Sequence, residues 1–172
     1  MAGASFAAGQ TAGLSGPVEG FTFDPPTASL RAVIGFPGAA SFGPAILGGV
    51  EWASVAPQRD YALAFQNGNF LVVSGLSSGT VSTLAVPGVT RVPESVSWSG
   101  DGTLAVLSSS SAEWLQTVSG LPSSPVAGAY IDVSSLGGSL TAVALDTTGS
   151  HIAIAVSGSQ AGIYLMTGSQ AF

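Results

Sequence analysis

Cysteine and lysine are both absent from this sequence of 172 residues. Without cysteine the chain can form neither a disulfide framework nor a thiolate metal site. The basic side chains are three arginines, Arg31, Arg59 and Arg91, and a single histidine. Three scattered arginines cannot build the positive stripe that a phosphate backbone requires. Nucleic acid is therefore excluded as a partner.

Charge of either sign is scarce as well. Charged residues make up 7% of the chain, whereas about 25% is usual for soluble domains. The net charge of -6 arises because bases are few, and the nine acids are spread singly without forming an acidic tail. Surface polarity must come from serine, threonine, glycine and the backbone. This composition is unusual for a cytosolic enzyme and favours an extracellular or cell-surface location, the periplasm included.

Long apolar runs are also missing, although 46% of the residues are hydrophobic. Glycine, serine, proline or aspartate interrupts every apolar stretch before it reaches the roughly 18 residues of a transmembrane helix. No transmembrane segment is predicted, and the high hydropathy is assigned to strands. Residues 1–20 lack the charged and apolar regions of a signal peptide, so they are interpreted as a flexible or strand-donating N-terminal arm, or as what remains after such a peptide is removed.

An internal repeat organises the rest of the chain. Three segments follow the pattern strand, polar turn, strand: residues 53–64, 96–106 and 142–154. Aligning Ala62, Ala105 and Ala153 gives spacings of 43 and 48 residues. These spacings lie within the roughly 40 to 50 residues of a propeller blade and exclude the 33- or 34-residue helical repeats. The pattern therefore predicts four-stranded blades in tandem.

The local chemistry of the repeat supports hairpins. Ser99–Gly102 and Asp146–Gly149 supply glycine at positive φ and side chains that cap their own backbone. The second strand of each repeat is apolar on both faces, as expected where sheets cover it from both sides. Further strands are expected between the repeats, at residues 70–73, 81–86, 114–118, 129–133 and 162–166.

The second repeat resembles a known family signature. Ser97-Trp-Ser-Gly-Asp-Gly-Thr-Leu-Ala-Val106 is similar to the "strand, Ser-Pro-Asp-Gly, strand" unit of bacterial β-propellers, which is related to WD-repeat and surface-layer or lactonase-type propellers. Ala144–Ala153 is a degenerate copy, and Phe21–Ala39 is similar to the opening of acidobacterial secreted propellers. The resemblance implies an all-β fold: an incomplete β-propeller of about three to three and a half four-stranded antiparallel blades.

The blades are expected over four segments of residues 21–172: an outer strand pair over 21–34, then blades over about 50–86, 94–134 and 140–166. Closed propellers have about 4 to 8 blades, so both ends of this array would expose unpaired sheet edges. The assembly edges are predicted at Phe21, Phe23, Ile163 and Leu165. A second copy of the chain, a following polypeptide or the N-terminal arm would cover them, so a homo-oligomer or a partner chain completing the propeller is expected.

Catalytic chemistry finds little support in the sequence. A nucleophilic triad would have to use His151, whose place after a turn favours an ordinary hydrogen bond, so no catalytic residue is predicted. Asp101 and Asp146 are interpreted as structural residues of equivalent turns. Glu51, Glu94 and Asp60 are candidates for a channel mouth. No metal site or cofactor is predicted, apart from a weak Ca²⁺ site that turn carbonyls and carboxylates leave open.

Two tryptophans are candidate binding residues. Trp52 and Trp98 fall near the innermost strands of successive blades, where they either fill the core between blades or line the channel as stacking platforms for sugars. The main functional hypothesis is a non-enzymatic extracytoplasmic scaffold that assembles through its open blade edges. The alternatives are the N-terminal half of a lactonase- or hydrolase-like propeller, and a carbohydrate- or peptide-binding module that uses either tryptophan.

Overall fold

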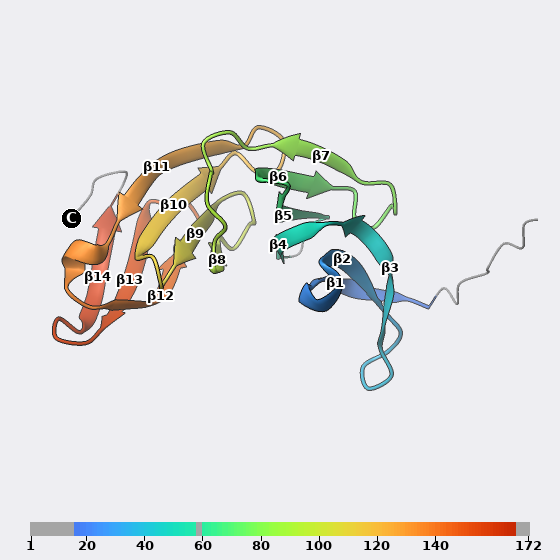
Figure 1. The fold of residues 1–172 in the computed structure, drawn as a ribbon, viewed down its shortest axis with the longest axis horizontal. Helices are drawn as coiled ribbons and strands as arrows, with labels where there is room; N and C mark the ends of the chain where they lie inside the picture. The colour runs from blue at the N-terminus through green and yellow to red at the C-terminus, as the bar shows by residue number, and fades with distance from the viewer. Residues whose placement is uncertain (1–15, 58–59, 168–172) are drawn as a thin grey trace, which may run out of the picture.

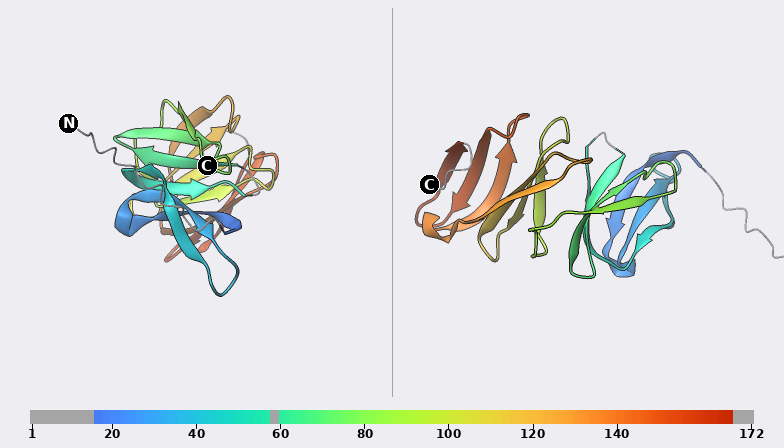
Figure 2. Two further views of the ribbon diagram at one scale, coloured as in Figure 1. Left: turned by 90° about the vertical axis from the view of Figure 1, so that its right-hand side faces the viewer. Right: turned by 90° about the horizontal axis from the view of Figure 1, so that it is seen from above.

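The computed structural model describes residues 16–57 and 60–167, which form four antiparallel sheets of three, four, four and three strands. The sheets follow one another in chain order along an arc (Figure 1), and the right-hand view of Figure 2 shows them side by side. Fourteen strands correspond to three and a half four-stranded blades. The predicted all-β, incomplete propeller is confirmed. None of the described residues belongs to a helix long and apolar enough to cross a membrane.

The strands within each sheet are paired in the order in which the chain reaches them. The first sheet contains β1 (Val18–Asp24), β2 (Ser29–Ile34) and β3 (Ser41–Gly48), and the second contains β4 (Val50–Val55), β5 (Tyr61–Gln66), β6 (Asn69–Ser74) and β7 (Ser82–Ala85). The third contains β8 (Ser95–Trp98), β9 (Ala105–Ser109), β10 (Trp114–Ser119) and β11 (Val126–Asp132), and the fourth contains β12 (Ser139–Leu145), β13 (His151–Ser157) and β14 (Gly162–Thr167). The two short 3-10 helices, η1 (Pro25–Thr27) and η2 (Ser134–Leu136), lie in connections.

Within residues 16–57 and 60–167, the two end sheets have one strand fewer than the middle sheets, and they are short of it on opposite sides. In the four-stranded sheets, the turn from the second to the third strand contains a non-glycine residue at positive φ, Asn67 or Glu113. Ala28 has the same conformation in the turn from β1 to β2, so β1 corresponds to a second strand. An equivalent backbone hydrogen bond supports this correspondence. The Val50 N–H donates to the Ala28 carbonyl in the first sheet's turn, and the Val133 N–H donates to the Glu113 carbonyl in the third sheet's turn, both at 2.9 Å. The first sheet therefore lacks its innermost strand and the fourth its outermost.

The structure corrects two details of the predicted blades. The pair expected over residues 21–34 is a three-stranded sheet, because β3 was missed; Pro44 and its mostly exposed residues conceal the strand pattern. The third repeat is also offset by one residue, because the first pair after the turn is Val55 with Ala62, Trp98 with Ala105, and Leu145 with Ile152. Ile152, and not Ala153, is the equivalent of Ala105. Of the predicted arm, residues 1–15 lie outside the described part, and Val18–Gly20 already belong to β1.

The core consists of three apolar layers, one between each pair of neighbouring sheets. Strand β5 shows how the sequence builds them. Leu63 and Phe65 join the layer shared with the third sheet, while Ala62 and Ala64 join the layer shared with the first. Successive side chains of a strand point to opposite faces, so a strand covered on both sides must be apolar throughout. This explains the runs that the sequence shows in the second strand of each blade.

Direct contacts between neighbouring sheets fix how the hairpin turns stack. The Tyr61 hydroxyl donates a hydrogen bond to the backbone carbonyl of Gly102 in the turn of the next sheet. Leu104 of that sheet in turn lies against Gly149, where a Cβ atom would come within 2.5 Å of Leu104 Cδ1. Gly149 also has a φ of +69°. Both the backbone conformation and the neighbouring sheet therefore require glycine at this position.

We expect Gly149→Ala to destabilise the protein by about 1 to 3 kcal/mol more than Gly79→Ala. Gly79 has the same φ of +69° but nothing within 4 Å of its Cβ position, so it isolates the backbone cost. Urea unfolding of both variants gives the comparison. In a Leu104→Ala background the difference should largely vanish; equal losses for the two glycines would contradict the contact.

Candidate functional site

Four hydrogen bonds from two adjacent serines surround the Glu94 carboxylate. This residue precedes β8, the innermost strand of the third sheet, and its backbone N–H donates to the Ser108 carbonyl at 2.9 Å. Its carboxylate accepts hydrogen bonds from the backbone N–H and the hydroxyl of Ser110, at 2.8 and 2.7 Å, and from both groups of Ser111. Two adjacent serines of the β9–β10 turn thus hold the carboxylate in one orientation.

These donors change the acidity of the carboxyl group. The Ser111 hydroxyl makes the largest contribution, followed by Ser110, and together they lower the pKa of Glu94 from 4.5 to about 2. Hydrogen bonds to the charged form favour that form. Glu94 is therefore an ionised acceptor at any physiological pH. Such a weakly basic carboxylate can orient hydroxyl groups of a ligand but is poorly matched to proton abstraction near neutrality.

A groove of about 280 Å³ opens beside this carboxylate, between the third and fourth sheets. One wall carries Ser95, Ser108 and Ser110, and the other is formed by β12 with Leu140, Thr141, Ala142 and Val143. The Ser95 and Ser108 hydroxyls share a hydrogen bond of 2.6 Å. The groove thus combines hydroxyl groups, apolar side chains and one fixed negative charge, a chemistry suited to ligands that carry hydroxyl groups on an apolar skeleton.

The structure places Trp52 and Trp98 within the packing between the second and third sheets, where both are half-buried. The Trp52 ring stacks on Phe70 at 6.1 Å, and the Trp98 ring meets Tyr61 edge-on at 5.8 Å. The Trp98 indole N–H donates to Ser54 Oγ at 3.1 Å. The two residues also occupy different positions in their strands, because Trp98 forms the pair next to the hairpin turn, with Ala105, whereas Trp52 pairs further along, with Phe65. They form no joint platform.

The four predicted edge residues separate into two groups. The side chains of Phe21 and Phe23 are half-buried and pack against the layer between the first and second sheets. Their strand β1 is nevertheless an edge strand, unpaired on one side among the described residues, so the assembly edge expected there stays a prediction that concerns its backbone. Ile163 and Leu165, by contrast, are 79% and 63% exposed on β14. Their face of the fourth sheet has no neighbour among the described residues.

The two turn aspartates bond to their own turns, but they occupy different positions. The Asp101 carboxylate accepts from the Thr103 N–H and the Ser99 hydroxyl, at 3.0 and 2.7 Å, which lowers the pKa of Asp101 to about 2. Asp146 takes the place that Ser99 has in the preceding turn, since the backbone N–H of each donates to the carbonyl five residues further on, that of Leu104 or His151. The carboxylate and its hydroxyl partner have exchanged places between the two turns.

Asp146 also contacts the single histidine. His151 Nδ1 lies 2.9 Å from Asp146 Oδ2, and this contact is the main cause of the lowered pKa of Asp146. Both side chains are substantially exposed on the fourth sheet. No nucleophile is held against the imidazole within the described part of the chain, so the pair is a turn contact and not a triad. Residues 16–57 and 60–167 also contain no group of three or more acidic or histidine side chains that could hold a metal ion.

Comparison with known proteins identifies the fold but no family. No family model and no curated protein matches the sequence. A solved protein from Lactobacillus plantarum is similar over 86% of this chain, with 11% identity and a TM-score of 0.53. A candidate 6-phosphogluconolactonase from Bacteroides fragilis matches 81% of the chain at 12% identity and a TM-score of 0.49, and a luciferin-regenerating enzyme matches 76% at 10% identity and 0.46. The chain spans about half the length of these structures: 52%, 48% and 49%.

These comparisons correct the expectation that the chain is not an enzyme. Two of the propeller-like structures that it resembles are named for an enzymatic activity. That expectation depended on the lack of a catalytic constellation in this sequence, yet the chain spans only 52% of the Lactobacillus plantarum structure that it matches. The residues of one half of such a fold cannot exclude activity in the whole. The fold likeness itself shows architecture and not chemistry.

Sequence reasoning named Glu94 as a residue near a channel mouth but could not place it. What fixes the carboxylate is the pair Ser110 and Ser111, which no prediction included. The run of four serines from Ser108 to Ser111 was a usable signal, because it follows an apolar strand directly. Hydroxyl and N–H groups clustered after a strand end are suited to binding an anion or a carboxylate. In this protein they bind the carboxylate of Glu94, from the same sheet.

We expect the serine contacts to govern the titration of Glu94. In a ¹³C-detected NMR titration, Glu94 should titrate near its pKa of about 2, and Ser111→Ala should move that pKa toward the ordinary 4.5. Because the pKa of Glu94 is lower in the folded than in the unfolded chain, its stabilising effect is full above pH 4.5 and is lost as the pH falls toward 2.

Urea unfolding tests the same linkage independently. Glu94→Gln should lose less stability than the wild type as the pH falls from about 4.5 to about 2, because it has no carboxylate to protonate. Glu19→Gln, which removes an exposed carboxylate from the first sheet, is the matched control. Identical acid limbs in the wild type and Glu94→Gln would show that the serine contacts are not formed in solution.

Proposed function

We propose that this chain is part of a β-propeller hydrolase of lactonase type, in which further polypeptide supplies the sheets that complete the ring. The observation that carries the proposal is the fixed Glu94 carboxylate beside the hydroxyl-lined groove on the inner side of the arc. A location outside the cytoplasm is part of the proposal, because the scarcity of charge favours it.

The chemistry of the groove suits a polyhydroxylated lactone. Hydroxyl groups of such a substrate would donate hydrogen bonds to Glu94, which stays ionised with a pKa of about 2. The paired hydroxyls of Ser95 and Ser108 offer further acceptors on the groove wall. Glu94 therefore binds and orients the substrate and does not act as the base.

Hydrolysis then requires groups that this chain does not supply. Water adds to the lactone carbonyl, the ring C–O bond breaks, and the leaving oxygen takes a proton to give the open-chain hydroxy acid. The residues that remove a proton from the water and return one to the leaving oxygen would come from the completing sheets, which face the groove across the central axis. The half-ring geometry supports this division, because active sites at the centre of a ring draw residues from several blades.

The direct test is lactone hydrolysis by the polypeptide in which this sequence continues into further repeats. A pH-stat assay with an aldonic-acid lactone measures the acid released. Glu94→Gln should lower kcat/KM about 10-fold or more, because a hydrogen bond to a charged group contributes about 1.5 to 3 kcal/mol. The loss should fall mainly on substrate binding, so KM should change more than kcat.

Glu19→Gln removes a carboxylate of the first sheet and should keep the wild-type rate within about twofold. Two outcomes would overturn the proposal. One is a completed polypeptide that hydrolyses neither lactones nor esters above the uncatalysed rate. The other is a Glu94→Gln variant with the wild-type kcat/KM.

A further inference from the structure

Neighbouring sheets make a recurring contact at the residue where the hairpin turn meets the second strand. Tyr61, Leu104 and His151 are equivalent there, because the carbonyl of each accepts from the residue that opens its turn, at 3.0, 2.9 and 3.1 Å. Tyr61 bonds to Gly102 and Leu104 lies on Gly149, and each of these glycines belongs to the turn of the following sheet. His151 is the third member of the series, and no following sheet is present beside it.

A second contact recurs on the innermost strands. Ser54 accepts the Trp98 indole N–H of the next sheet at 3.1 Å, and Ser97 donates to the Val143 carbonyl of the sheet after that. The equivalent position of the fourth sheet is Ala144, because Ser54, Ser97 and Ala144 each form the second pair beyond the turn. Ala144 is exposed and offers no hydrogen bond. The inner-strand contact is thus apolar at this open end.

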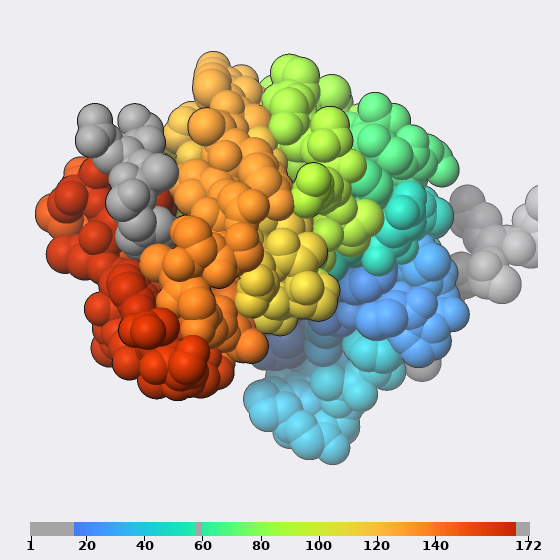
Figure 3. Space-filling model, turned by 60° about the vertical axis from the view of Figure 1, so that its left-hand side comes forward, coloured from blue at the N-terminus to red at the C-terminus, as the bar shows by residue number. Residues whose placement is uncertain are grey.

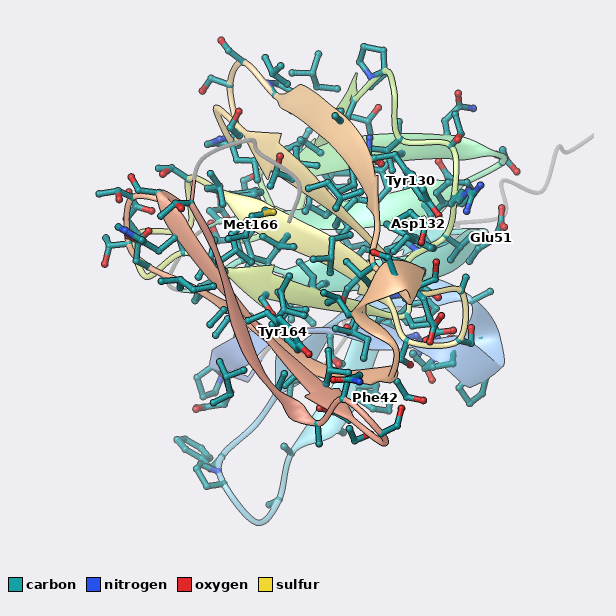
Figure 4. All side chains as sticks on the ribbon, turned by 90° about the vertical axis from the view of Figure 1, so that its left-hand side faces the viewer. Phe42, Glu51, Tyr130, Asp132, Tyr164 and Met166 are labelled. Carbon is teal, nitrogen blue, oxygen red and sulfur yellow. The ribbon has the colours of Figure 1, made fainter. Side chains whose placement is uncertain are left out.

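The centre of the open face of the fourth sheet is apolar, with the paired His151 and Thr167 at one end. Register aligns six apolar side chains in two rows across the three strands: Ala144, Ala153 and Leu165 in one, Ala142, Ala155 and Ile163 in the other. The other face carries Ile152, Ile154 and Met166, which are buried against the third sheet. Figure 3 shows the fourth sheet as the end of the molecule, and Figure 4 looks onto it, with Tyr164 and Met166 labelled on β14.

We infer that this open face binds one further antiparallel sheet, which sets a glycine-bearing turn over His151 and large apolar side chains over the four alanines. The inference rests on the proposed larger propeller, but its subject is the surface and not the reaction. The layer between the third and fourth sheets shows that the buried face of such a sheet is apolar, because Leu115 and Val106 there meet Ile152 and Ile154 of the fourth. Protein interiors are close-packed. The four small alanine side chains of the open face therefore leave space that large apolar side chains of the added sheet would fill.

A second copy of this chain does not fit the face. The first sheet of a second copy, which head-to-tail packing would bring there, begins with β1 and so has no described turn from a first to a second strand to set over His151. Its outer side carries the polar group Asp24, Ser29 and Arg31 beside the apolar pair Val33 and Phe42. Arg31 Nε lies 3.5 Å from Asp24 Oδ2 and donates to Ser29 Oγ at 3.1 Å. Covering this partly hydrated ion pair with alanine, isoleucine and leucine would remove its remaining water without supplying any partner. The occupant is therefore a sheet of additional polypeptide with an apolar inward face.

An extended chain provides a probe of this surface. Residues 168–172 are replaced by a second copy of Gly120–Thr167. The copied β11 supplies the missing outermost strand of the fourth sheet, and the copied β12 to β14 supply a sheet whose Ile152, Ile154 and Tyr164 face inward. Its Gly149 turn falls over the original His151. The substitution that reports on the face is Ala155→Arg, made in the first copy only.

In the natural chain Ala155→Arg should leave Tm nearly unchanged, because the face is open there. In the extended chain it should lower Tm by about 5 °C or more, because an arginine is forced between packed sheets. Thr83→Arg on exposed β7 of the second sheet is the matched control and should have little effect in either chain. Light scattering of the natural chain should show a monomer.

Three outcomes would overturn the inference. An equal Tm shift in the two chains, or failure of the extended chain to fold, would show that such a sheet does not pack there. A natural-chain dimer that Ala155→Arg dissociates would assign the face to a second copy. None of these results depends on lactone hydrolysis, so failure of this inference and failure of the proposed function are distinguishable.

Discussion

The fold depends on face-to-face packing of neighbouring sheets. Each strand pairing supplies backbone hydrogen bonds, but the apolar layers lie between sheets, and burial of apolar surface is the main stabilising term. A three- or four-stranded sheet alone could not bury both of its faces. Fully buried residues such as Leu63, Leu107 and Ile154 therefore belong to layers that two sheets share. The scarcity of charge follows from the same constraint, because inner strands with two covered faces leave few positions for charged side chains.

Much of this architecture could be predicted from the sequence, because two-sided burial and turn chemistry leave local marks. The apolar second strands and the glycine turns at Gly102 and Gly149 gave the blade repeat directly. Strand β3 was concealed by Pro44 and by the exposure of most of its side chains. The one-residue offset at Ile152 arose because alternating alanine and isoleucine fit either register by composition. The pairing of β13 with its neighbouring strand shows which of its residues lie on each face of the sheet. The sequence of β13 alone does not.

The candidate site was less accessible to prediction for a physical reason. A carboxylate becomes a fixed anion through the geometry of its donors, and Ser110 and Ser111 lie on a different strand connection from Glu94. Trp52 and Trp98 attracted attention because tryptophan is conspicuous in a sequence. Their indole rings proved to serve the packing of the second and third sheets, with the Ser54 hydroxyl bonding the indole N–H of Trp98. Aromatic residues near an axis are therefore weak evidence for a ligand unless their exposed ring faces are known.

In the part of the chain that the structure describes, the first sheet has no innermost strand, whereas the fourth sheet has no outermost strand. A polypeptide that continues this ring leaves it at the rim and must return at the axis to pair with β1. The returning strand would then form part of the channel wall across from Glu94. Closure of the ring would also complete the cavity. A partly synthesised chain would therefore have the Glu94 carboxylate in place but no enclosed cavity around it.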